Sequence, residues 1–301
     1  MTRVAVVTGG NKGIGFAIVK KLCKQFDGVV YLTARDVNRG LNAIKQLEKQ
    51  GLKPKFHQLD ITDDNSISTF YNYLEQKYKG LDILVNNAAI AFKMDAKEPF
   101  SIQAAETLKT NYFGLRKVCS KLYPLLKPHA RVVHVSSSSG HLSLIPSETL
   151  RNRFLNPNLT EEELDNIMHE FVEYVKLLQI YYNLLYFKIN ILIFNYIFSA
   201  AKTNTHLEKG WANSAYIVSK VGVSALARVH QRIFNSDSRQ DLVVNAVHPG
   251  YVDTDMTSHR GTLTPDQGAE APVFCALLPE DTNIKGKYIW YDKSLVDWTK
   301  A

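Results

Sequence analysis

The sequence contains few cysteines and no dense run of basic residues. Its three cysteines, Cys23, Cys119 and Cys275, are widely spaced in 301 residues. An odd number at such spacing argues against a disulfide framework or a metal site, so we expect reduced thiols, a cytoplasmic location and no metal. The net charge of +7 comes from scattered Lys and Arg residues. This pattern fits solubility and an anionic small ligand better than it fits nucleic acid.

The N-terminal segment lacks the long apolar region of a signal peptide, because glycines follow residues 4–8 at once. Those apolar, β-branched residues instead predict a buried first strand. Hydrophobic residues make up 45% of the chain and charged residues 22%, as in soluble globular proteins. The length allows one large α/β domain or two small ones.

Short apolar runs alternate with amphipathic segments along most of the chain. Helices are expected at 16–26, 38–50, 65–78, 102–126 and 216–234, with a further helix starting at Pro265. Strands are expected at 4–8, 29–33, 55–59, 81–85, 131–135, 242–247 and 287–291. This alternation predicts one α/β domain over residues 1–301, a doubly wound parallel sheet of the Rossmann type.

A glycine-rich turn lies between the first strand and the first helix. Gly9, Gly13 and Gly15 would let the backbone approach a pyrophosphate at the helix N-terminus, although a plain tight turn is the alternative. Arg35 follows the second strand, twenty residues after Gly15, where a dinucleotide fold contacts the adenine ribose. Arg35 together with Lys12 favours NADP over NAD, the alternative being a solvated Arg–Asp pair.

Tyr216 and Lys220 are the candidates for proton transfer. Residues four apart share one face of a helix, so their side chains can meet in one pocket. A nearby cation lowers the pKa of a phenol, which makes the pair a plausible general acid. The same spacing also arises from a half-buried ring beside a solvated charge.

Several ordered motifs resemble the short-chain dehydrogenase/reductase family. They are residues 8–15 (TGGNKGIG), 86–89 (NNAA), 109–111 (KTN), 135–137 (VSS), Tyr216-x-x-x-Lys220 and Pro249-Gly250. Residues 32–36, 56–61, 160–164, 209–211 and 270–272 look like its NADPH-dependent carbonyl reductase branch. The resemblance covers nearly the whole chain and implies reduction of ketones, aldehydes or quinones to alcohols by NADPH.

The resemblance implies a catalytic role for four residues. Ser137 would hydrogen-bond the substrate carbonyl, and Tyr216 would deliver the proton. Lys220 would lower the pKa of Tyr216 and hold the nicotinamide ribose, while Asn111 would anchor a water that relays protons to Lys220. The cofactor contacts implied are Gly9, Asn11, Lys12, Gly13, Ile14, Gly15, Arg35, Asp60, Ile61, Asn87, Tyr216, Lys220, Pro249, Gly250, Val252 and Thr254.

Substrate contacts follow less directly from the resemblance. Phe92, Lys93 and Gln103 match positions that contact a glutathione moiety in some relatives, so glutathione conjugates are possible substrates; solvated surface side chains are the alternative. Tyr251 stands where carbonyl reductases often carry tryptophan, which changes the expected substrate pocket. Ala89 stands where many relatives have glycine, and its methyl group would slightly crowd the cofactor site.

Residues 148–213 form an insertion before Tyr216. Residues 148–174 resemble a helical segment of carbonyl reductases that covers the tetramer face of other members, which implies a monomer. Residues 177–198 lack Gly, Ala, Pro, Asp and Glu. They have the length of a membrane helix, but Lys188 and three asparagines make a membrane span unfavourable, so we expect no membrane contact. A substrate lid and a buried helix are further alternatives.

The composition of this run suggests translated intron, because its residue types have A/T-rich codons. A donor sequence at residues 173–175 and an acceptor at Ser199 would bound 78 bases, divisible by three. Their removal would delete 26 residues, leave 275 and shorten the Ser137–Tyr216 interval from 79 to 53. From the family resemblance, the leading hypothesis is that the protein functions as an NADPH-dependent carbonyl reductase. The alternatives are a non-catalytic NADPH-binding scaffold and a membrane-attached reductase using residues 177–198.

Overall fold

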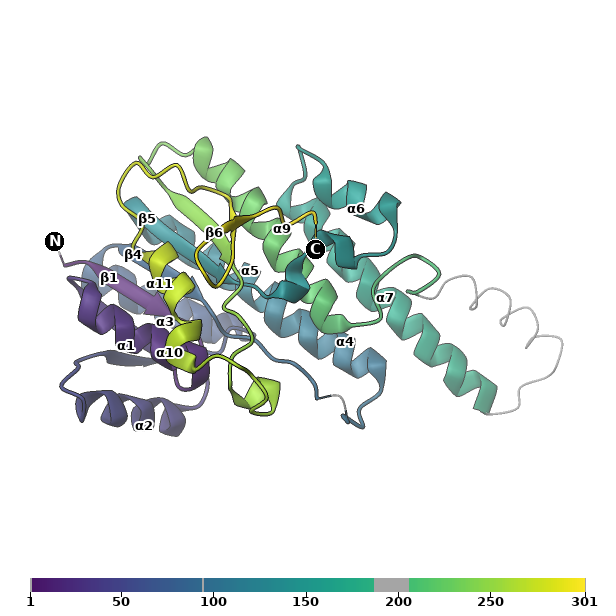
Figure 1. Cartoon of the computed structure of the whole chain (residues 1–301), viewed down its shortest axis with the longest axis horizontal. Coiled ribbons are helices and arrows are strands. Elements are labelled where there is room, and N and C mark those ends of the chain that lie inside the picture. The colour runs from purple at the N-terminus through teal and green to yellow at the C-terminus, as the bar shows by residue number, and fades with distance from the viewer. Residues whose placement is uncertain (1, 94, 187–205, 301) are drawn as a thin grey trace.

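The computed structural model describes residues 2–93, 95–186 and 206–300 (Figure 1). Its strands are β1 (Val4–Val7), β2 (Val29–Ala34), β3 (Lys55–Gln58), β4 (Leu81–Asn86), β5 (Leu126–Val135), β6 (Val243–Val247), β7 (Tyr288–Ile289) and β8 (Leu295–Val296). Its α-helices are α1 (Gly13–Gln25), α2 (Val37–Glu48), α3 (Asp64–Tyr78), α4 (Phe100–Leu108), α5 (Leu115–Leu122), α6 (Glu148–Leu155), α7 (Glu161–Tyr186), α9 (Ala215–Asn235), α10 (Pro265–Gly268) and α11 (Glu270–Ala276).

The strands form one sheet in the order β3-β2-β1-β4-β5-β6-β7-β8. Neighbouring strands from β3 to β7 are parallel, and only β8 pairs in the antiparallel direction, with β7. Chain order reverses between β1 and β4, which leaves a crevice at the carboxyl ends of these strands where ligands bind in such sheets. The predicted doubly wound Rossmann fold is confirmed.

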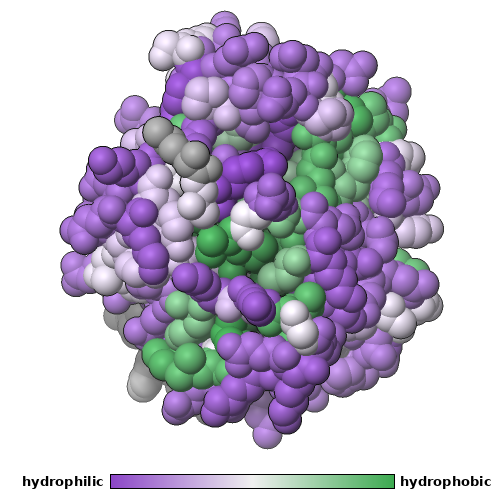
Figure 2. Space-filling view, turned by 90° about the vertical axis from the view of Figure 1, so that its left-hand side faces the viewer, coloured by the Kyte–Doolittle hydropathy of each residue, from purple (hydrophilic) through white to green (hydrophobic). Residues whose placement is uncertain are grey.

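Each face of the sheet is buried under its own layer of helices. One core contains apolar residues of α1, α2 and α11, and the other contains residues of α3, α4, α5, α7 and α9. Interior strands such as β1 and β6 are buried along their whole length, which explains their continuous apolar runs, whereas the edge strand β3 is partly exposed. On the face drawn in Figure 2 hydrophilic residues dominate, and hydrophobic residues appear between them near the centre and upper right.

Side-chain caps account for several helix starts. Asp36 caps α2 by accepting from the Arg39 N–H at 2.8 Å. Thr264 and Gln267 form a reciprocal capping box at α10, with Pro265 at the first helical position. The predicted start of a helix at Pro265 is confirmed.

The prediction of one continuous helix over residues 102–126 is wrong in its detail. The backbone is π-helical from Lys109 to Gly114 between α4 and α5, and Leu126 already belongs to β5. The last strand is also shorter than predicted, and β8 was missed. π-Helical turns often mark functional sites, and this one contains Asn111.

The insertion contributes α6 and α7. Helix α7 packs against α4 and α9 and passes through the proposed junction at residues 173–175, where Val175 is fully buried (Figure 1). Residues 187–199 of the intron hypothesis, and residues 187–198 of the membrane hypothesis, lie outside the described residues. Within the described ranges, no helix has both the length and the hydropathy needed to cross a membrane.

Candidate active site

A cleft of about 620 Å³ lies at the carboxyl ends of β1, β2, β4 and β5. Fourteen predicted site residues line it: Gly9, Asn11, Lys12, Gly13, Ile14, Gly15, Arg35, Asp60, Ile61, Asn87, Tyr216, Lys220, Pro249 and Thr254. They come from segments far apart in the sequence. The sheet brings them together because parallel strands end at one edge.

The glycine turn fits tightly against the end of β4. Gly9 and Gly13 adopt positive φ values of 64° and 54°, which glycine tolerates best. A Cβ at Gly15 would lie 2.3 Å from the Gly9 carbonyl oxygen and 2.4 Å from Asn87 Nδ2. The Asn87 amide donates to the Thr8 and Gly9 carbonyls at 2.9 and 3.1 Å. Asn87 therefore supports the turn as well as lining the cleft.

The N-terminus of α1 is open to an anion. Its first turn contains no acidic residue, and the side chain of its N-cap residue, Lys12, makes no capping hydrogen bond. Such a terminus presents unpaired N–H groups and the positive end of the helix dipole. The turn and helix therefore fit a pyrophosphate.

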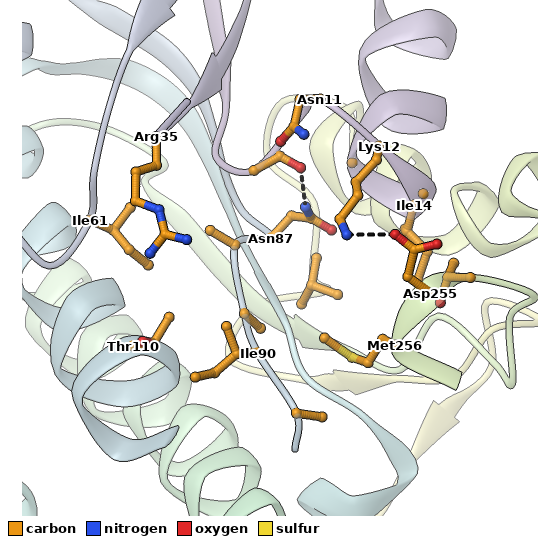
Figure 3. A pocket seen from close by; sticks show the side chains of 18 of the residues that line it. Asn11, Lys12, Ile14, Arg35, Ile61, Asn87, Ile90, Thr110, Asp255 and Met256 are labelled. Atoms are coloured by element: carbon orange, nitrogen blue, oxygen red, sulfur yellow. Dashed lines mark hydrogen bonds and ion pairs between the residues drawn. The ribbon is translucent and has the colours of Figure 1, made fainter. Parts of the chain in front are cut away.

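Lys12 and Arg35 both line the cleft but point to different parts of it, so their joint contact with a 2′-phosphate stays a prediction. Lys12 Nζ lies 2.6 Å from Asp255 Oδ2, and Figure 3 shows Arg35 on the other side of the cleft, beside Ile61. The exposed Asp255 carboxylate attracts the flexible Lys12 side chain. Sequence spacing could not reveal this contact. Arg39 also lines the cleft. Sequence reasoning missed Arg39, although a second arginine four residues after Arg35, in the first turn of α2, was a usable signal.

Tyr216 and Lys220 meet at the cleft as their spacing predicted. Both lie on the first turns of α9, which Ser214 caps by accepting from the Ile217 N–H. Lys220 is 3% exposed, and its Nζ donates to the Val135 carbonyl at 2.8 Å. The same ammonium lies 5.7 Å from the centre of the Tyr216 ring. Burial therefore holds the lysine at one position beside the tyrosine.

The pKa of Tyr216 is shifted upward in the described protein, and its predicted lowering by Lys220 stays a prediction. Burial raises the pKa of Tyr216, and a hydrogen bond with Ser137 opposes this rise. Burial also lowers the pKa of Lys220 to about 8. Both shifts have the same main cause, because burial disfavours the charged forms of the phenol and the amine. The Tyr216 phenol consequently keeps its proton at neutral pH.

Ser137 and Asn111 lie next to this pair but do not form the cleft wall. Ser137 is half-buried, and its Oγ accepts from the Ser139 N–H at 3.2 Å. The buried Asn111 amide exchanges two hydrogen bonds with the backbone of Ile90 and donates to Ser219 Oγ at 3.1 Å. Asn111 thus fastens the segment after β4 to α9, and its predicted water relay stays a prediction.

The remaining predicted contacts do not border the cleft. Val252 is 2% exposed, with its side chain directed at Gly268, and Gly250 likewise lies outside the lining. The predicted substrate positions Phe92, Lys93, Gln103 and Tyr251 are also absent from it. Gln103 Nε2 donates to the Glu98 carbonyl, and Tyr251 is 49% exposed.

Besides Arg39, several other residues that line the cleft were not predicted. Ile90, Thr110 and Met256 point into it (Figure 3). Met256 Sδ lies 3.9 Å from the Tyr216 hydroxyl, so this side chain borders the reacting end of the cleft. Ile90 directly follows the 86–89 motif and Thr110 lies inside the 109–111 motif, so proximity to these motifs was the available signal for both residues.

A buried cluster behind the cleft brings together Cys119, His134 and His230, whose ligand atoms all lie within 4.8 Å of one another. The sequence excluded a metal because the cysteines are far apart, a reason that does not apply to this mixed cluster. Tyr123 Oη, however, lies 2.6 Å from His230 Nδ1, which also contacts His134 Nε2 at 3.2 Å. Because these groups already pair with one another, we read the cluster as a hydrogen-bonded core network.

The comparisons with known proteins agree with this geometry. The sequence model described as short chain dehydrogenase matches residues 3–147. Carbonyl reductase [NADPH] 1 of Sus scrofa is 46% identical over 99% of this chain and 94% of its own. The Homo sapiens protein of that name is 44% identical over 98% of both chains.

Solved structures give the same result. Salutaridine reductase from Papaver somniferum superposes with a TM-score of 0.78 at 33% identity, covering 96% of this chain and 99% of its own. Menthone neomenthol reductase from Mentha piperita has a TM-score of 0.73 at 29% identity, with 97% and 99% covered. The chain therefore belongs to the short-chain dehydrogenase/reductase family, in its NADPH-dependent carbonyl reductase branch.

Proposed function

We propose that this protein reduces ketones, aldehydes or quinones to alcohols with NADPH. The observation that carries the proposal is that Tyr216 and Lys220 line a cleft with an open helix N-terminus and two arginines, while Ser137 lies beside the cleft and hydrogen-bonds Tyr216. The glycine turn and α1 would hold the pyrophosphate, and Arg35 with Arg39 would hold the 2′-phosphate. The 44–46% identity to carbonyl reductases supports the same assignment.

The residues of this chain orient the carbonyl and supply the proton. NADPH supplies the hydride when it is bound. Ser137 Oγ donates a hydrogen bond to the substrate oxygen, and Tyr216 transfers its phenolic proton there as negative charge develops. The raised pKa of Tyr216 keeps it in the protonated form that this direction requires. Lys220 supplies positive charge beside the resulting phenolate.

The test is loss of NADPH absorbance with menadione or isatin as substrate. Tyr216→Phe removes the proton donor, so we expect kcat to fall by about 10²–10⁴-fold. Tyr71→Phe on α3, which removes a hydroxyl bonded to Glu75, is the control and should retain full activity. A protein that binds NADPH without turnover would instead be a scaffold, and the proposal would fail.

The finer properties follow as further proposals. Helix α7 covers α4 and α9, which supports a monomer; light scattering after size-exclusion chromatography tests this. The free Cys23, Cys119 and Cys275 support a cytoplasmic location. Recognition of glutathione conjugates would rest on Phe92, Lys93 and Gln103, and the ratio of KM values for a quinone and its glutathione adduct tests it.

We also propose that residues 174–199 are retained intron or a gene-model error. The residue composition and the 78-base span support this. Sequencing the transcript across codons 173–199 tests it directly. A dominant messenger that keeps all 78 bases would refute the proposal.

A further inference from the structure

His248 lies directly after β6, between the serine loop and the C-terminal segment. It is 7% exposed. Its backbone N–H donates to the Ile289 carbonyl at 2.8 Å, and its ring packs on Trp290 with the centroids 4.2 Å apart. Strand pairing and stacking therefore fix both the backbone and the ring.

The fixed ring accepts a hydrogen bond from the serine loop. The Ser138 N–H donates to His248 Nδ1 at 2.9 Å, and the Gly250 N–H points at the same atom from 3.4 Å. A neutral imidazole that accepts at Nδ1 carries its proton on Nε2. Burial keeps the ring neutral by lowering the pKa of His248 to about 4, and nearby His141 acts in the same direction.

The Ser138 N–H belongs to the peptide group that follows Ser137. The carbonyl at the other side of that peptide accepts a hydrogen bond from Tyr288 Oη. His248 and Tyr288 thus hold one peptide plane from both ends. That plane fixes the ψ angle of Ser137, an extended residue with φ −169° and ψ 163°. The direction of its side chain relative to Tyr216 depends on this restraint.

We propose that His248 is a positioning residue for the reaction: with Tyr288 it clamps the Ser137–Ser138 peptide and aims Ser137 Oγ at the substrate oxygen. The inference rests on the proposed function, because it acts through Ser137. None of the sequence motifs discussed above includes His248.

The first test compares two substitutions of His248. His248→Phe keeps a ring but removes the acceptor, and we expect kcat to fall about tenfold, since small misplacements of reacting groups are costly. His248→Asn places an amide oxygen near the position of Nδ1 and should recover most of kcat. NADPH affinity, measured by fluorescence titration, should stay within twofold in both. His57→Phe on the edge strand β3 is the matched control for replacing a histidine by a ring.

The second test removes Ser137. If His248 acts through the serine, His248→Phe should cost almost nothing further in a Ser137→Ala background. An undiminished tenfold loss in that background would overturn the inference, as would a kcat for His248→Phe within twofold of the parent. If His248→Phe does not fold, Tyr288→Phe, which removes only the other clamp bond, takes its place in the same cycle. Full activity of Ser137→Ala alone would instead refute the role of the serine in the proposed function.

Discussion

Lys12 has two competing partners, and this competition gives a measurable prediction. In the structure its ammonium pairs with Asp255 at 2.6 Å, and both side chains are 61% exposed. Lys12 must leave Asp255 before it can bind a cofactor phosphate. Exposed ion pairs contribute about 0.2–1 kcal/mol, which corresponds to at most about a fivefold change in affinity. Asp255→Asn should therefore tighten NADPH binding by up to about fivefold.

Fluorescence titration with NADPH at low and high salt provides the assay. Asp253→Asn is the matched control, because Asp253 lies in the same loop and carries the same charge but contacts His259 at 2.7 Å, not Lys12. A gain that is larger for Asp255→Asn than for Asp253→Asn, and that shrinks with salt, is expected. Equal gains would show a long-range charge effect only, and an unchanged Kd for Asp255→Asn would refute the reasoning outright.

Titration with NADH identifies the phosphate that Lys12 binds. A gain confined to NADPH would place Lys12 at the 2′-phosphate, whereas equal gains for both cofactors would place it at the pyrophosphate. Figure 3 favours the pyrophosphate, since Lys12 lies across the cleft from Arg35. In the Lys12→Ala background the gain from Asp255→Asn should disappear, which shows that it acts through the lysine.

Three further predictions concern the cleft and its supports. Gly15→Ala should destabilise the fold by about 1–3 kcal/mol in urea unfolding, because its Cβ would meet the Gly9 carbonyl at 2.3 Å; a stability equal to the parent would contradict this. Arg35→Ser combined with Arg39→Ser should weaken NADPH binding at least tenfold and leave NADH nearly unaffected; equal losses would place the arginines elsewhere. Between pH 6.5 and 4 the unfolded state binds a proton that folded His248 excludes, so the free energy of unfolding should fall by about 3 kcal/mol. His248→Asn should remove that part of the acid dependence, and an unchanged slope would assign it to other groups.

The sequence could predict the sheet and the glycine turn because both depend on local patterns. Apolar runs give buried strands, and alternation with helices gives a parallel sheet. The π-helical turn at residues 109–114 was not predictable in this way, since the same residues read as ordinary helix. β8 was missed because two residues carry no periodicity.

The candidate site likewise contains a part that the sequence predicted and a part that it did not. Motif positions placed Tyr216, Lys220 and the glycine turn correctly at one cleft. The partners of long side chains were not predictable: Lys12 contacts Asp255, 243 positions away in the sequence. The Ser138–His248 bond likewise joins residues 110 positions apart. Contacts of this kind arise because the segments that follow different strands lie next to one another at one edge of the sheet.

Burial decides the protonation of the catalytic pair, and the four-residue spacing does not contain that information. Spacing alone suggests that Lys220 lowers the pKa of Tyr216. In the folded protein Lys220 is buried against the Val135 carbonyl, and its own pKa is about 8. The lysine thus stays mostly charged at pH 7, while the tyrosine keeps its proton. Because carbonyl reduction consumes that proton, the same burial that raises the pKa of Tyr216 favours the reductive direction near neutral pH.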